Sequence, residues 1–279
     1  MRASTQQTLS LPPFTPVVTW LLATNTAVYF ALVLLGMSSP ESYARAIDWF
    51  ALRPSAVVHG WVWQTITYSF LHGGFSHWFF NMLALWMFGP QIEGVRGSRY
   101  FLELFLAGVI GGALFSIALP YSGVFGDPTI PTVGASAGIY AVLMAFGILF
   151  AENEIIMIPL PIRIKAKYFV AILIVATLAF SLQGRNGIAD IAHLGGLLFG
   201  FLFVKFVPAR GLSFRLSEGY FGAKNSYHRW KRERAKKKFQ VYMRKHNQDP
   251  KQYFDEYGNF RPPDEQEKNG RGGPGGWVN

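Results

Sequence analysis

The chain has 279 residues, of which 51% are hydrophobic and only 15% are charged, and its formal net charge is +10. Soluble domains usually have roughly a quarter of their residues charged, so this composition argues against an ordinary water-soluble fold. The sequence contains no cysteine, which excludes disulfides, thiol catalysis and cysteine-based zinc or iron–sulfur sites.

The positive charge is concentrated at one end of the chain. Seventeen of the 26 lysines and arginines lie between Lys205 and the C-terminus, and only nine lie in the first 204 residues. We therefore divide the chain into a short N-terminal segment (1–15), an apolar body that needs a nonaqueous solvent (16–207) and a basic tail (208–279).

The body contains repeated apolar segments of the length that a helix needs to cross a membrane. The first, residues 16–37, is uncharged and too long for a typical signal-peptide core, so we interpret it as a retained span. Five more segments follow it at about 76–92, 104–126, 134–151, 168–184 and 189–207. The expected fold is all-α, a polytopic membrane protein with six transmembrane helices. Asp190 and His193 interrupt the last segment, so hydropathy alone leaves five spans as the alternative.

The lysines and arginines between the segments predict the orientation of the chain. With six spans, one side holds Arg2, the turn with Arg96 and Arg99, the turn 163–167 and the whole tail. Cytoplasmic connections are enriched in Lys and Arg, so both termini are expected in the cytoplasm. The compact form and the lack of an organelle presequence favour a bacterial inner membrane. The long connection 38–75, on the other side, is rich in aromatic residues and is expected to lie partly in the headgroup region.

Four strongly polar residues lie inside the predicted spans, where such groups are costly and are therefore functional candidates: His77, Asn81, Ser136 and His193. His77 and Ser136 each lie sixteen residues, roughly 24 Å along a helix, from the glutamate at the inner end of their span, Glu93 or Glu152. Asn81 lies twelve residues, roughly 18 Å, from Glu93, and His193 lies the same distance from Lys205. Three separate spans are thus predicted to bring polar groups to one layer.

The sequence around Ser136 predicts that a helix begins there, inside the membrane. Pro131 and Gly134 disfavour a helix before the serine, and irregular backbone at that depth must line a water-filled cavity or be buried in protein. A helix N-terminus also offers unpaired N–H groups to a serine alkoxide or an oxyanion. Gly196 and Gly200 form a small-residue face on the last span, so its neighbour can approach closely.

If that neighbour is the fourth span, His193 comes within hydrogen-bond reach of Ser136 and can serve as the base that a hydroxyl nucleophile needs. His77 and Asn81 lie one turn apart on one helix face, where both can donate to a developing negative oxygen. Tyr140, one turn after Ser136, is interpreted either as a ring that stacks on His193 or as a plain core residue. Each residue also has a structural alternative: a serine bonding back to its own helix, a packing histidine, an asparagine joining two helices. Their matching depths favour the functional interpretation.

The motifs in the body resemble those of the rhomboid family of intramembrane proteases over residues 16–206. They are Phe70-Leu-His72 with His77-x-x-x-Asn81, Gly134-x-Ser136-x-Gly138, and Ala192-His193-x-Gly-Gly196. The family often carries Trp-Arg in the first outer loop, where this chain has Trp63-Gln64, and this departure weakens any claim about how that loop is anchored. His72 is expected to pin the outer loop, not to take part in chemistry.

The resemblance implies a six-helix bundle with a water-accessible pocket and a catalytic Ser–His dyad, which cuts transmembrane-helix substrates within the lipid bilayer. Carried onto this chain, Ser136 is the nucleophile and His193 the base, and no metal or organic cofactor is required. The oxyanion would be held by His77, Asn81 and the Ser136 backbone N–H. Gly134 would shape the serine loop and Tyr140 would support His193.

Three other interpretations compete with a protease of this family. A soluble α/β-hydrolase fits the Gly-x-Ser-x-Gly motif followed by Asp190 and His193, but the span-length apolar segments argue against it. Asp190 as an additional partner of His193 stays open. A transporter would use the polar layer to bind its cargo without needing both Ser136 and His193. A catalytically silent relative acting as an adaptor or chaperone would usually lack one of the two.

The tail differs from the body in its composition. Residues 225–246 are predicted to form a basic helix, with aromatic or apolar side chains on one side: Tyr227, Trp230, Phe239 and Tyr242 or Met243. Beside a membrane span, such a helix indicates contact with anionic lipid headgroups, whereas nucleic acid is a weaker interpretation and is not expected. A solvated helix without a dedicated partner is the alternative. The Pro- and Gly-rich end is expected to be disordered.

Overall fold

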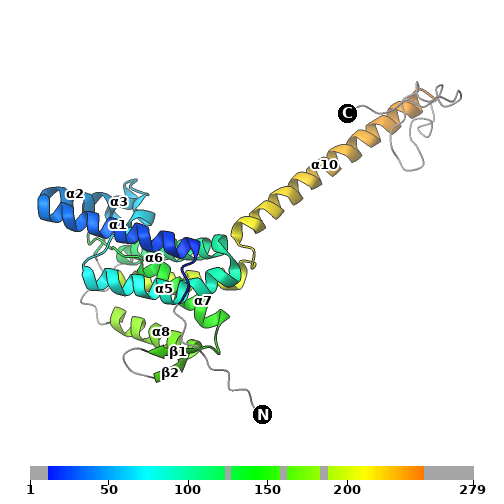
Figure 1. Cartoon of the computed structure of the whole chain (residues 1–279). Helices are drawn as coiled ribbons and strands as arrows, with labels where there is room; N and C mark the ends of the chain where they lie inside the picture. Colours follow the sequence, from blue (N-terminus) through cyan, green and yellow to red (C-terminus); the bar gives the residue numbers. More distant parts are fainter. Residues whose placement is uncertain (1–11, 123–126, 158–161, 183–187, 248–279) are drawn as a thin grey trace, which may run out of the picture. The chain divides into compact units, whose positions relative to one another are not determined.

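The chain folds into two compact units, Met1–Arg215 and Leu216–Asn279. The computed structural model describes residues 12–122, 127–157, 162–182 and 188–247. The first unit is built mainly from helices, and the described part of the second belongs to one long helix (Figure 1). The prediction of a mostly helical protein is confirmed.

The described residues of the first unit contain six long helices, and each overlaps one of the predicted apolar segments. They are α1 (Pro16–Ser38), α5 (Phe75–Arg96), α6 (Ser98–Tyr121), α7 (Ser136–Leu149), α8 (Ala166–Leu182) and α9 (Ile188–Phe206). Among the described residues, α1 and α6 are long and apolar enough to cross a membrane, while α7 and parts of α8 and α9 are shorter apolar helices. Six spans therefore stays a prediction.

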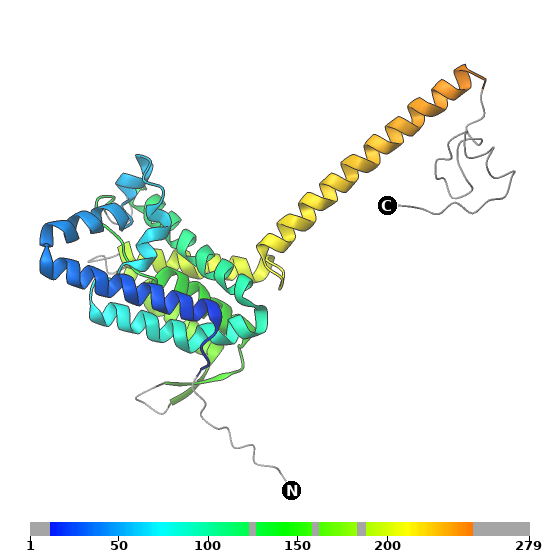
Figure 2. The same ribbon diagram turned by 45° about the horizontal axis from the view of Figure 1, so that its top comes forward.

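Helices α6, α7 and α9 form the centre of this unit, each packed against the other two. Helix α5 packs against α1 and α7, and α1 and α5 run side by side in both views (Figures 1 and 2). Helix α9 lies close to α7 because Gly196 has no side chain: a Cβ atom there would overlap the carbonyl oxygen of Ala137. This contact determines how far His193, on α9, lies from the start of α7.

The connection between α1 and α5 is folded into short helices: α2 (Pro40–Phe50), α3 (Pro54–Val58), α4 (Gln64–Thr67) and the 3₁₀ turn η1 (Tyr68–Phe70). Ser39 caps α2 by accepting a hydrogen bond from the Ser42 backbone N–H (3.3 Å). Leu52, just after α2, pairs with Thr132 as an isolated antiparallel bridge. This bridge joins the connection to the segment that precedes α7.

The prediction of an all-α fold is wrong at one place. Between α7 and α8 the chain forms an antiparallel hairpin of β1 (Glu154–Met157) and β2 (Ile162–Lys165), with Glu154 opposite Lys165. Both strands contain two isoleucines, whose β-branched side chains favour extended backbone. Arg163 also pairs with Glu154 across the strands (3.6 Å). From its lysines and arginines, the sequence predicted only a turn at residues 163–167.

Helix α10 (Leu212–Lys245) is longer than the segment 225–246 predicted from the basic run. The prediction that its aromatic residues share one side of the helix is wrong. Phe239 lies nine residues after Trp230, and at 3.6 residues per turn this places the two about 180° apart. The exposed residues Tyr220, Tyr227 and Trp230 do share a face, because their spacings of seven and three residues match the helical repeat.

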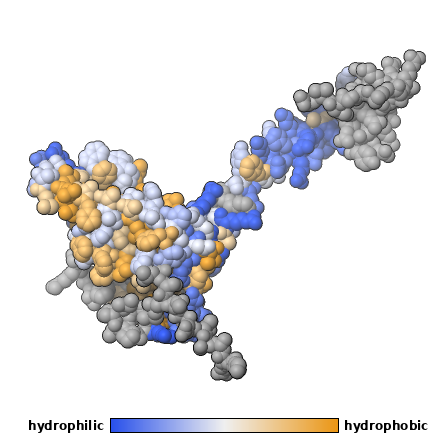
Figure 3. All heavy atoms as spheres, in the orientation of Figure 1, coloured by the Kyte–Doolittle hydropathy of each residue, from blue (hydrophilic) through white to orange (hydrophobic). Residues whose placement is uncertain are grey.

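Large apolar side chains are exposed on the bundle helices, including Trp20, Phe30, Phe80, Leu114 and Val175. Figure 3 shows apolar residues over the visible face of the bundle, and mostly hydrophilic residues along α10. An apolar exterior of this kind is suited to lipid, whereas the surface of α10 is suited to water or to charged headgroups.

Candidate active site

Ser136 is the first residue of α7, and the backbone before it explains why the helix begins there. Gly134 has a φ of +127°, a conformation that residues with a side chain rarely adopt. A Cβ atom on Gly134 would also lie 2.7 Å from Nε2 of His77, so a side chain would collide with that ring. The Gly134 N–H donates to the carbonyl of Tyr68 (2.9 Å). Ser136 is therefore presented at the start of a helix, where the first backbone N–H groups have no partner within the helix.

His193 and Ser136 come together across the close contact between α9 and α7. The Nε2 atom of His193 lies 2.8 Å from the Oγ atom of Ser136, which is hydrogen-bond distance. If this nitrogen lacks a proton, it can accept the one on the hydroxyl. The geometry is that of a nucleophile beside its base.

Tyr140 lies one turn after Ser136 on α7, and its ring stacks on the imidazole of His193. The ring centroids are 4.3 Å apart and the planes differ by 6°. Stacking over a whole ring face restricts how the imidazole can turn, so Tyr140 helps to keep Nε2 directed at Ser136.

His77 approaches the same point from α5. Its Nδ1 atom accepts a long hydrogen bond from the Gly73 backbone N–H (3.4 Å). In a neutral imidazole that accepts at Nδ1, the proton is on Nε2, and this is the atom that lies against Gly134. His77 is thus arranged to donate toward the space beside Ser136.

Asn81 lies one turn further along α5 and is buried. Its Nδ2 atom donates to the backbone carbonyl of His77 (2.7 Å). An amide nitrogen carries two hydrogens, so the same group retains a second one to donate. The structure places Asn81 beneath His77, on the helix face expected from their spacing of four residues.

His72 is buried just before α5, and its ring meets that of His77 edge to face, with centroids 5.1 Å apart. Burial, followed by the proximity of His77, lowers the pKa of His72 to about 4, so the ring is neutral at ordinary pH. A neutral ring adds no positive charge beside His77. The side chain of Asp190, considered as a further partner of His193, lies outside the described part of the structure.

Sequence reasoning missed the contacts that hold the serine loop. Gln64 is fully buried and makes hydrogen bonds to three backbone groups, so the pair Trp63-Gln64 does anchor its loop, a point on which the sequence made no claim. The sequence shows that Gln64 replaces the usual arginine, but the hydrogen-bond partners of Gln64 are backbone atoms, which no residue pattern reveals. In the part of the chain that the structure describes, no group of three or more His, Asp or Glu side chains is arranged to hold a metal ion.

Comparison with known proteins gives one matching family. The family model described as the rhomboid domain matches residues 59–210, which include Ser136, His193, His77 and Asn81. The chain is 35% identical over 139 residues to the mitochondrial Rhomboid protein 1 of Saccharomyces cerevisiae, an alignment that covers 48% of this chain and 39% of the yeast protein.

Two relatives from Bacillus subtilis align over 188 residues, 67% of this chain. The rhomboid protease GluP is 31% identical, and the alignment covers 34% of its length. The protein YdcA is 30% identical, and the alignment covers 86% of its length. The chain therefore spans only about a third of GluP and about two fifths of the yeast protein, but most of YdcA.

Proposed function

The chain belongs to the rhomboid family, and we propose that it is an intramembrane serine endopeptidase. It would hydrolyse peptide bonds in or next to the transmembrane helices of other membrane proteins. The observation that carries this proposal is the 2.8 Å contact between Ser136 Oγ and His193 Nε2 at the start of α7. A serine hydroxyl is a weak nucleophile, and an adjacent base is what activates it.

In the first half of the reaction, Ser136 Oγ bonds to the scissile carbonyl carbon while its proton passes to Nε2 of His193. The carbonyl oxygen becomes negative and accepts hydrogen bonds from the Ser136 backbone N–H, His77 Nε2–H and Asn81 Nδ2–H. The C–N bond then breaks, and His193 returns the proton to the leaving amine. An ester between Ser136 and the substrate's acyl part remains.

In the second half, water attacks this ester. His193 takes a proton from the water as it attacks, and the second tetrahedral intermediate uses the same three donors. When the C–Oγ bond breaks, His193 gives the proton back to Ser136. The cycle consumes one water per bond cut and returns both residues to their starting states, so it needs no metal and no organic cofactor.

The proposal includes a membrane topology. Six spans with both termini in the cytoplasm of a bacterium would place Ser136 below the outer face of the inner membrane. The exposed apolar side chains of the bundle helices support a lipid surrounding. Substrate helices have their backbone groups bonded internally, so they must unwind before Ser136 can reach a carbonyl. Substrates should therefore carry Gly, Pro or polar residues near the cut.

The decisive experiment is cleavage of a single-span substrate by the purified protein in liposomes, compared with Ser136→Ala and His193→Ala. Cleavage by the wild type, lost in both variants while their thermal unfolding is unchanged, is the expected result. Cleavage that survives Ser136→Ala would refute the dyad. If the wild type cuts none of several substrates with destabilised helices, the chain acts instead as a catalytically silent, rhomboid-like adaptor or chaperone.

We also propose that α10 binds anionic lipid headgroups. The helix carries eleven Lys or Arg and two Glu, and it begins six residues after Phe206 at the end of α9. Tyr220, Tyr227 and Trp230 give it an exposed aromatic stripe, and the Arg234 guanidinium lies 5.1 Å from the Trp230 ring centre. Such a helix can bury aromatic side chains at the headgroups while its cations bind the phosphates.

The test uses the full-length protein in nanodiscs of neutral lipid or of neutral lipid with about a third anionic lipid. Trp fluorescence of a variant that retains only Trp230 should shift to the blue in the anionic discs alone, and replacing Lys236, Lys237 and Lys238 with Gln should reduce the shift. Identical spectra in both discs would show that α10 is a solvated helix without this partner.

A further inference from the structure

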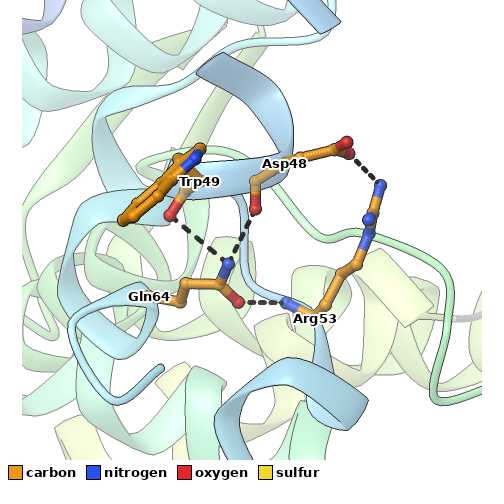
Figure 4. Close-up of polar contacts among 4 residues, drawn as sticks. All are labelled: Asp48, Trp49, Arg53 and Gln64. Carbon is orange, nitrogen blue, oxygen red and sulfur yellow. Dashed lines mark hydrogen bonds and ion pairs between the residues drawn. The ribbon is translucent and has the colours of Figure 1, made fainter. Parts of the chain in front are cut away.

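Gln64 joins the end of α2 to α4 through its side-chain amide (Figure 4). Its Oε1 atom accepts from the Arg53 backbone N–H (3.0 Å), and its Nε2 atom donates to the carbonyls of Asp48 (2.9 Å) and Trp49 (3.4 Å). The last carbonyls of a helix have no partner within the helix, and α2 ends at Phe50. Gln64, which is fully buried, supplies these missing partners.

Two neighbours of Gln64 complete the cap. The indole N–H of Trp63 donates to the Trp49 carbonyl (2.9 Å), and the Thr67 hydroxyl donates to the Phe50 carbonyl (2.8 Å). Gln64 differs from both because it also accepts a hydrogen bond, from a residue beyond the end of α2. It therefore fixes the direction in which the chain leaves the helix.

The segment that leaves α2 holds the loop before Ser136. Leu52 exchanges two backbone hydrogen bonds with Thr132 (3.0 and 2.8 Å), and the Ser55 N–H donates to the Pro128 carbonyl (3.0 Å). From the other side, the segment after α4 holds the same loop through the bond from Gly134 to the Tyr68 carbonyl. The loop 128–134 is thus tied to the two segments that Gln64 connects.

We propose that Gln64 is a positioning residue for Ser136. By joining α2 to α4 it keeps both supports of the loop 128–134 in register, and so keeps Ser136 Oγ directed at His193. This inference rests on the proposed protease activity. It makes Gln64 part of the dyad's support, although no atom of Gln64 touches the reacting groups.

The amide is suited to this position in a way that a guanidinium is not. It presents one acceptor to the Arg53 N–H and two donor hydrogens to carbonyls, whereas an arginine side chain has donors only. The nearby ion pair of Arg53 with Asp48 (2.6 Å) joins α2 only to the segment that follows it, and it lies partly in solvent, where such pairs contribute little. The buried amide of Gln64 also reaches α4, so it does what this ion pair cannot.

The test compares Gln64→Met, which keeps the length and apolar packing but makes none of the three hydrogen bonds, with the neighbouring Thr65→Val. Among the described residues, the Thr65 hydroxyl donates to the Val62 carbonyl within the same turn (2.7 Å), so its loss should leave the loop in place. We expect Gln64→Met to lower kcat by about ten- to a hundredfold with KM within about twofold, because small displacements of a nucleophile are costly. Amide exchange at Thr132 and Gly134 should speed up in Gln64→Met and not in Thr65→Val.

One outcome would overturn the proposal: if Gln64→Met lowers the unfolding temperature but leaves kcat per folded molecule and both exchange rates unchanged, the residue is structural only. A wild-type kcat in Gln64→Arg would overturn the narrower claim that this position needs an acceptor for the Arg53 N–H. Should the wild type show no Ser136-dependent cleavage, the proposed function fails, while exchange at Thr132 and Gly134 still decides whether Gln64 holds the loop.

Discussion

The two ends of helix α5 are held in different ways. Its first turn carries His77, which lies against the Gly73 N–H, Gly134 and the neutral ring of His72. Its last turns carry Glu93, a buried carboxylate that accepts four hydrogen bonds of 2.5–3.0 Å. One end of the helix faces the dyad, and the other is fastened by a charge.

Glu93 fastens the start of two neighbouring helices at once. It accepts from the Val17 and Val18 backbone N–H groups in the first turn of α1, which have no partner within that helix. It also accepts from the hydroxyls of Thr15, just before α1, and of Ser98, the first residue of α6. A negative charge is favourable at both places because it faces the positive ends of helix dipoles.

A carboxylate would be unsuitable at the other end of α5. The proposed reaction builds negative charge on a carbonyl oxygen beside His77, and a fixed negative group there would oppose it. The contacts that hold the serine loop come instead from neutral backbone groups, namely the Tyr68 carbonyl, Leu52 and the Ser55 N–H. Changes at the dyad end should therefore affect activity, and changes at the Glu93 end should affect stability.

The largest expected effect on activity outside the dyad is that of His77→Ala. Losing one donor to the oxyanion should lower kcat by about 10²–10³-fold, with little change in unfolding temperature. Cleavage of a single-span substrate in liposomes measures this. His59→Ala is the matched control, since that exposed ring makes its hydrogen bond to the nearby Ser55 carbonyl, away from the dyad, and it should keep full activity. A kcat within about threefold of wild type in His77→Ala would remove His77 from the mechanism.

At the opposite end, Glu93→Gln should reverse this pattern. The amide turns an N–H group toward hydrogen-bond donors, so the free energy of unfolding should fall by about 1.5–3 kcal/mol. The kcat of the folded fraction should stay within about twofold of wild type. Denaturant or thermal unfolding in detergent provides the measurement, with Glu41→Gln, whose carboxylate makes an exposed pair with Arg45, as the control. An activity loss without a stability loss would break the comparison.

A smaller effect is expected for Tyr140, which supports the dyad only through its ring. Tyr140→Leu removes the stacking on His193 and should lower kcat by about tenfold, roughly 1.4 kcal/mol of transition-state stabilisation. Tyr140→Phe keeps the ring and should lose much less. Steady-state kinetics of both variants decides the matter, and equal losses would show that the hydroxyl, and not the stacking, is what His193 needs.

The sequence predicted the bundle well because its signals are periodic and chemical. Charge-free stretches located the ends of five long helices to within four residues, and they placed α6 five to six residues too late. The small residues Gly196 and Gly200 predicted the close approach that brings His193 to Ser136. The rise per residue of a helix was enough to predict that Ser136 and His77 lie at one depth, because each lies sixteen residues from a glutamate at the end of its span.

What it could not predict are features made by backbone atoms or by weak local preferences. The bridge between Leu52 and Thr132 uses main-chain groups that every residue has, so no pattern marks it. The support from Gln64 was missed because its partners are carbonyls and an N–H group. The β1–β2 hairpin was missed because its strands of four residues are too short for a clear alternation.

The smallest effect is expected at the β1–β2 hairpin, whose neighbouring charges are exposed and lie at neither end of α5. Hydrogen bonds from Lys165 and then Lys167 lower the pKa of Glu152 to about 2, although the carboxylate is mostly exposed. Because the pKa is lower in the folded state, the stabilisation is present above about pH 4.5 and is lost as the pH falls toward 2. Exposed pairs are weak and are screened by salt.

Glu152→Gln should therefore speed amide exchange in β1 and β2 slightly at pH 6, and this effect should disappear in high salt. Neither kcat nor the unfolding temperature should change measurably. A loss of activity in this variant would mean that an exposed charge outside α5 also affects catalysis. The assignment of activity to one end of α5 and stability to the other would then be too simple.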